Sequence, residues 1–144
     1  MWLAYALAAS ALWGFEYAIV GRILGDRLSP LSLVSIQMVV GSLGLGVIAW
    51  ATGALRRDVS VVSGDQALFW LVLASILVFT LGNLMIAVSI KEGNAVLAGF
   101  VEISYPLFII LFSVLLGWGA SLGPRTVFGG LVILVGVLIL KSEQ

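Results

Sequence analysis

Five long apolar runs, separated by short polar or Gly- and Pro-containing joints, dominate the sequence. Each run is long enough, or nearly so, to cross a bilayer core of about 30 Å as a helix rising about 1.5 Å per residue. The pattern predicts an all-α integral membrane protein with five transmembrane helices, over about residues 2–24, 31–54, 67–90, 95–117 and 126–140. Residues 1–144 form a single predicted domain without an internal repeat, and only the joint 56–66 is predicted to be a real loop.

Two joints carry strong helix boundary signals. Ser29-Pro30 supplies an N-cap followed by proline at the first helical position. Gly93-Asn94 supplies a glycine that ends one helix and an asparagine that caps the next. The third and fourth predicted helices are therefore expected to form a tight hairpin.

Composition removes most other classes of protein. The chain of 144 residues is 62% hydrophobic and 10% charged, and its mean hydropathy is +1.22, which is typical of a membrane protein. Its net charge is +0, so nothing points to a nucleic-acid partner. With 0 Cys and 0 His, disulfides, thiolate nucleophiles and histidine metal sites are excluded. We predict no enzymatic activity, no metal and no cofactor.

The basic residues are nearly balanced between the two sides of the predicted bundle. Of the 7 Lys and Arg residues, three lie on the side of the N-terminus and four on the other. Because a clear excess is needed to orient a membrane protein, this balance predicts insertion in both orientations. The first run has no Lys or Arg ahead of it and continues past the small residues Ser10 and Ala11, so it is expected to be retained as a helix and not cleaved as a signal peptide.

Four strongly polar residues are predicted to lie within the spans, in the same half of the membrane. They are Glu16, Gln37, Asn83 and Glu102. Ionisable residues inside a membrane are costly and usually functional, so the two acids are the first candidates for a binding site. Gln37 and Asn83 are weaker candidates, because such amides often only join helices.

Aromatic and small residues surround the two acids. Trp13 and Tyr17 flank Glu16, and aromatic faces bind cations. Nearly opposite Glu16 lies a stripe of small residues, and one face is expected to pack a helix while the other lines a cavity. On the fourth helix Tyr105 and Pro106 follow Glu102. Pro106 has no N–H for the carbonyl of Glu102, so a kink is predicted there.

The chemistry of these acids favours proton-coupled exchange. No Lys or Arg lies well inside a predicted span, and desolvation without a counter-charge favours the neutral form of a carboxyl group. Such a group binds either a proton or a cationic substrate. The alternative is that Glu16 and Glu102 only hold helices together.

The order of several short motifs resembles the EamA-like domain of the drug/metabolite transporter superfamily, over essentially the whole chain. The motifs are Ala11-Leu12-Trp13-Gly14, Leu28-Ser29-Pro30-Leu31, Leu81-Gly82 with Ala87, Tyr105-Pro106-Leu107-Phe108, and Gly129-Gly130 with Gly136-Val137. The resemblance implies a transporter in a prokaryotic inner or plasma membrane. Two departures are Gln37, where many members carry Arg, and Gly117-Trp118, where many carry Gly-Glu. The more acidic interior argues against carrying over an anionic substrate.

Most members of that superfamily hold two such units in one chain, related as an inverted pair, whereas this chain holds one. The resemblance therefore implies half of an inverted-repeat transporter, completed as an antiparallel homodimer or by a similar subunit. The leading functional prediction is a dimeric, proton-coupled exporter or exchanger of a cationic or amphipathic small metabolite or drug. The main alternative is a non-coupled membrane component, such as a lipid-translocating or accessory subunit.

Overall fold

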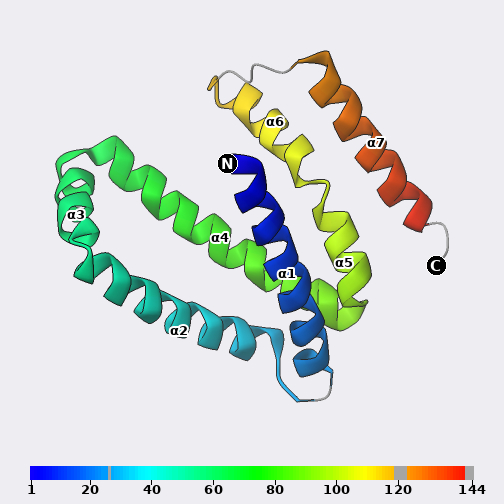
Figure 1. The fold of residues 1–144 in the computed structure, drawn as a ribbon, viewed down its shortest axis with the longest axis horizontal. Coiled ribbons are helices and arrows are strands. Elements are labelled where there is room, and N and C mark those ends of the chain that lie inside the picture. Colours follow the sequence, from blue (N-terminus) through cyan, green and yellow to red (C-terminus); the bar gives the residue numbers. More distant parts are fainter. Residues whose placement is uncertain (26, 119–122, 142–144) are drawn as a thin grey trace. The chain divides into compact units, whose positions relative to one another are not determined.

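The computed structural model describes residues 1–25, 27–118 and 123–141, and the described chain is helical (Figure 1). Its helices are α1 (Trp2–Leu24), α2 (Pro30–Ala51), α3 (Ala54–Gly64), α4 (Gln66–Glu92), α5 (Ala95–Glu102), α6 (Tyr105–Leu115) and α7 (Pro124–Lys141). They divide into two compact units. The terminal unit comprises Met1–Ile19 with Gly93–Gln144, and the central unit comprises Val20–Glu92.

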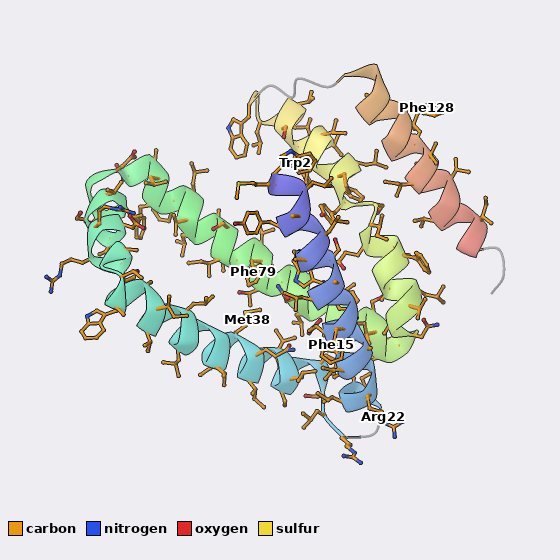
Figure 2. All side chains as sticks on the ribbon, viewed as in Figure 1. Trp2, Phe15, Arg22, Met38, Phe79 and Phe128 are labelled. Carbon is orange, nitrogen blue, oxygen red and sulfur yellow. The ribbon has the colours of Figure 1, made fainter. Side chains whose placement is uncertain are left out.

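The helices have the length and composition of membrane spans. Within the described residues, 4 stretches are long and apolar enough to cross a bilayer, and α7 adds the shorter apolar stretch Val127–Val137. Large apolar side chains project outward along the helices, such as Phe128 of α7, which is 70% exposed (Figure 2). In hydrocarbon these side chains face lipid and need no protein cover. The chain is an integral membrane protein, and the predicted fold class is confirmed.

The central unit has a small core where the last turns of α1 and α4 meet the start of α2. Its least exposed side chains, each at 5% or less, are Val20, Leu24, Leu33, Val34, Ala87 and Ile90. The start of α2 is built as predicted, since the Ser29 hydroxyl accepts a hydrogen bond from the Ser32 N–H at 3.2 Å. Nearby, Lys91 Nζ donates to the Leu28 carbonyl at 3.4 Å, which joins the end of α4 to the α1–α2 connection.

The predicted loop at 56–66 is wrong, because α3 occupies most of it. The second span is also shorter than predicted: α2 ends at Ala51, and Gly53 adopts a left-handed φ of 74° that separates it from α3. A single Asp65 separates α3 from α4, and its Oδ1 accepts from the Leu68 N–H at 3.0 Å. Polarity suggested a loop, but the residues of α3 repeat with the helical period.

The fourth predicted span is two helices instead of one. Asn94 begins α5 as predicted, with its side chain accepting from the Leu97 N–H at 2.8 Å. The helix stops at Glu102, and α6 begins at Tyr105 with proline in its first turn. The predicted kink is therefore a break, visible between α5 and α6 in Figure 1. Pro106 causes it, because proline cannot continue the hydrogen bonds of α5 but suits the start of a helix.

Glycines shape the rest of the terminal unit. Gly117 ends α6 in a left-handed φ of 70°, and the Trp118 N–H donates to the Ser113 carbonyl at 2.9 Å. This is a common way to close a helix C-terminus. Gly130 lets α7 approach α6, since a Cβ there would lie 2.8 Å from Leu107 Cδ2. The two helices thus meet closely, and a larger residue at position 130 would require the Leu107 side chain to move.

Candidate functional site

A cavity of about 610 Å³ lies within the terminal unit. It is bounded by α1, α5 and the start of α6, with Ile133 of α7 completing the wall. Most of its lining is apolar, and four aromatic side chains contribute to it: Trp13, Tyr17, Phe100 and Tyr105. Its size and apolar character are those of a small-molecule site.

The polar centre of this cavity is a hydrogen bond between two helices. The Tyr17 hydroxyl of α1 donates to Glu102 Oε2 at the end of α5. Both residues are half-buried. A phenol donating to a carboxylate is a charge-assisted hydrogen bond, which is stronger than a neutral one. It holds the carboxyl group of Glu102 toward the aromatic residues of α1.

Gly99 positions the ring of Tyr17. A Cβ at residue 99 would lie 3.5 Å from Tyr17 Cδ2 and 3.8 Å from its Cε2. The tyrosine ring therefore packs directly over the backbone of α5, one turn before Glu102. A branched side chain at residue 99 would push the ring away from the carboxyl group.

The break between α5 and α6 positions Glu102. Its carboxyl group belongs to the last residue of α5, where the helix dipole favours a positive charge. The next residues, Ile103 and Ser104, connect to α6, and the Ser104 N–H donates back to the Val101 carbonyl at 3.1 Å. A carboxylate, a helix C-terminus and aromatic faces together make a site suited to an organic cation.

The structure brings five of the predicted site residues to this cavity: Trp13, Tyr17, Glu102, Tyr105 and Pro106. Glu16 is half-buried, next in sequence to Tyr17, and is not among the described residues that line the cavity. The other two predicted residues belong to the central unit. There Gln37 is exposed, and Asn83 Nδ2 donates to the Phe79 carbonyl of its own helix at 2.8 Å.

The face of α1 that lines the cavity is the one with the small residues. Its members are Ser10, Trp13, Gly14, Tyr17 and Ala18, which follow the i, i+3, i+4, i+7 spacing of one helical face. The stripe of small residues was predicted as a face nearly opposite Glu16, but it was not predicted to line a cavity together with Trp13 and Tyr17. Sequence reasoning also missed Phe100, whose helical spacing from Val96 and Ile103 was the available signal.

The ligands this site offers are one carboxylate, hydroxyls and aromatic rings. Among the described residues, no group of 3 or more His, Cys, Asp or Glu side chains is arranged to hold a metal ion. These groups can bind a ligand by ion pairing, hydrogen bonding and cation–π contact.

Comparison with known families gives a match that covers nearly the whole chain. Residues 1–142 match the EamA-like transporter family, which confirms the resemblance drawn from the motifs. Comparisons with curated proteins and with solved structures found no match.

Proposed function

The chain belongs to the EamA-like transporter family, and from this premise we propose that it exchanges a cationic or amphipathic small metabolite or drug for protons. Transport needs a site that binds cargo among the helices, whereas an enzyme needs groups that make or break covalent bonds. The cavity of the terminal unit is the candidate for such a cargo-binding site. The proposal is therefore a transporter and not an enzyme, in a prokaryotic inner or plasma membrane.

The single observation that carries the proposal is the Tyr17–Glu102 hydrogen bond in an aromatic-lined cavity. Glu102 supplies the negative charge that an organic cation needs. Trp13, Phe100 and Tyr105 supply apolar contact, and each face attracts a cation by about 0.5–2 kcal/mol. Cargo with a positive charge and an apolar body fits this combination best.

Competition at one carboxyl group would couple the two fluxes. Glu102 binds a proton or an organic cation, and binding of one disfavours the other. The α5–α6 break lies next to this residue, so movement of the two half-helices about Ile103 and Ser104 would alter access to it. Glu16, adjacent to Tyr17, is proposed as a second acid that adds negative potential beside the site.

Proton release measures this competition directly. Purified protein in weak buffer near neutral pH should release protons when tetraphenylphosphonium or ethidium is added. Glu102→Gln removes the exchangeable proton and should abolish release. Glu92→Gln is the matched control, because Glu92 is an exposed acid at the end of α4, and this variant should release protons as the wild type does.

Other outcomes would reject specific parts of the proposal. No release by folded wild-type protein, with the cation bound, would reject proton coupling. No binding of either cation would point to neutral or lipid cargo. Release that is lost in Glu16→Gln but retained in Glu102→Gln would move the site to the other acid.

We also propose that the transporter works as a homodimer with its two copies antiparallel. The near-balance of the 7 Lys and Arg residues permits both orientations, and an odd number of spans lets two inverted copies form a pseudo-symmetric pair. A similar second subunit in place of the second copy would satisfy the same geometry.

A further inference from the structure

The short helix α3 is held at the ends of two spans. Only Thr52 and Gly53 separate it from α2, and only Asp65 separates it from α4. Figure 1 shows α3 between the ends of these two helices, and all three contact one another within the central unit. Because α2 and α4 cross the membrane, connections this short keep α3 at the membrane surface.

Two tryptophans mark the level of that surface. Trp50 lies in the last turn of α2 and is 72% exposed, and Trp70 lies near the start of α4 and is 58% exposed. Tryptophan is enriched at the boundary between hydrocarbon and headgroups. The residues that precede and follow α3 therefore lie at the interface, and α3 lies beside them.

The sequence of α3 is amphipathic. Leu55, Val59 and Val62 share one face by their i, i+4 and i+7 spacing. Leu55 is 43% exposed and Val59 is 57% exposed, so this face is only partly covered by the neighbouring helices. A second face, with the same spacing, carries Arg56, Ser60 and Ser63.

The polar side of α3 offers positive charge. Arg57 Nε donates to Asp58 Oδ1 at 2.9 Å, and this carboxylate raises the pKa of Arg57 above its ordinary value. The neighbouring Arg56 is exposed, and its side chain has no hydrogen-bond or ion-pair partner within the part of the chain that the structure describes. The Ser60 and Ser63 hydroxyls donate to carbonyls of their own helix at 2.7 and 3.1 Å.

We propose that α3 is an interfacial helix that binds the headgroups of anionic phospholipids. Leu55 and Val59 enter the boundary of the acyl chains, and Arg56 contacts lipid phosphate above it. This is the arrangement adopted by amphipathic helices with arginine on the polar face. Arg57 contributes less because Asp58 already neutralises it. The proposal does not depend on the transported substrate.

The depth of the two faces tests the placement. The chain has 0 Cys, so Val59→Cys and Ser60→Cys each accept a single bimane label in protein reconstituted into phosphatidylglycerol vesicles. A label at residue 59 should be quenched by lipids brominated along the acyl chain and protected from aqueous iodide. A label at residue 60 should show the reverse. The proposal would be overturned if iodide quenched both labels. It would also be overturned if neither brominated lipid nor iodide quenched the label at residue 59.

The preference of α3 for anionic lipid is tested with a bimane label on Ser63→Cys. Headgroup spin-labelled phosphatidylglycerol should quench it more than the corresponding phosphatidylcholine at equal content. Arg56→Gln should reduce this preference about fivefold, the usual contribution of one arginine near an anionic surface. Arg57→Gln should reduce it less.

Asp58→Asn is the matched opposite change, because it releases Arg57 while leaving both arginines in place. It should increase the preference for phosphatidylglycerol. Equal quenching by the two lipids in the labelled protein, or a preference unchanged by Arg56→Gln in folded protein, would show that α3 does not bind anionic headgroups.

Discussion

At the scale of single residues, Tyr17 is the side chain that organises the candidate site. Its ring packs over Gly99 and its hydroxyl reaches Glu102, so one residue of α1 contacts α5 in two ways. Glycine leaves the space and tyrosine fills it. The tyrosine thereby fixes the carboxyl group of Glu102 beside α1.

The Tyr17–Glu102 hydrogen bond should be measurable as a coupling free energy. Tyr17→Phe keeps the ring and removes the donor, and Glu102→Gln keeps the shape and removes the charge. Each variant should lower the free energy of unfolding in mixed micelles by about 1 kcal/mol, the usual range for such bonds in membranes. The double variant should lower it by clearly less than the sum of the two single effects.

Exact additivity in that cycle would mean that the two side chains do not interact in the membrane. Tyr5→Phe is a suitable control, since Tyr5 is 72% exposed and lies on the same helix. Its effect should be independent of Glu102.

At the scale of elements, the chain ends and restarts helices at two kinds of residue. Pro106 separates α5 from α6 at the candidate site, and Gly53 separates α2 from α3 at the membrane surface. Proline acts by lacking an N–H, whereas Gly53 acts through its left-handed φ of 74°. Positions 106 and 53 are therefore expected to tolerate different substitutions.

Gly53→Ala should destabilise the protein by about 1–2 kcal/mol, because a Cβ is unfavourable in the left-handed region. No atom lies within 4 Å of the added Cβ, so the loss arises from backbone conformation and not from crowding. Gly53→Asn should cost less, since asparagine adopts this conformation more readily. Unfolding in mixed micelles measures both variants.

Gly41→Ala provides the comparison inside α2. It also meets nothing within 4 Å, but its backbone is helical, so alanine should be neutral or stabilising. Equal effects at residues 41 and 53 would contradict the conformational explanation.

At the scale of the whole molecule, lipid replaces much of the protein core. The described side chains with the least exposure are a few apolar residues, such as Leu24 at 1%, while apolar residues on every span remain exposed. Most charged residues lie at the ends of the spans, in α3 or in the short connections. The near-balance of Lys and Arg predicts that the direction of insertion is unspecified.

If the balance of charge decides orientation, single added charges should shift it. Reporters fused to the C-terminus should be active on both sides of the membrane for the wild type. Glu92→Lys adds a positive charge on one predicted side and Ser63→Lys adds one on the other. The two variants should shift the reporters in opposite directions, because each retains its added charge in the cytoplasm.

Activity on one side only, for the wild type and both variants, would reject dual orientation. It would then favour a parallel dimer or a partner subunit. Protein abundance should be measured in parallel, so that the reporter signals are compared per molecule.

The sequence by itself determined the membrane class, the approximate spans, a disturbance of the helix near Pro106, predicted as a kink, and the family. These features depend on residues that are close together in the sequence. A span depends on the hydropathy of about 20 consecutive residues, and a helix break depends on the missing N–H of one proline. Ser29 and Asn94 were predicted as caps for the same reason, since a cap acts within three residues of itself.

Only the tertiary structure decided which residues share a cavity. The spacing of Trp13, Tyr17 and Ser10 was present in the sequence, but the rotation of α1 about its axis depends on what packs against it, here Gly99 of α5. The cavity is therefore lined by the face of α1 next to Glu16, and a role for Glu16 itself stays a prediction. The helix α3 was not predicted, because its residues are as polar as those of a surface loop. An amphipathic helix with a charged face toward water and lipid headgroups has the same average polarity.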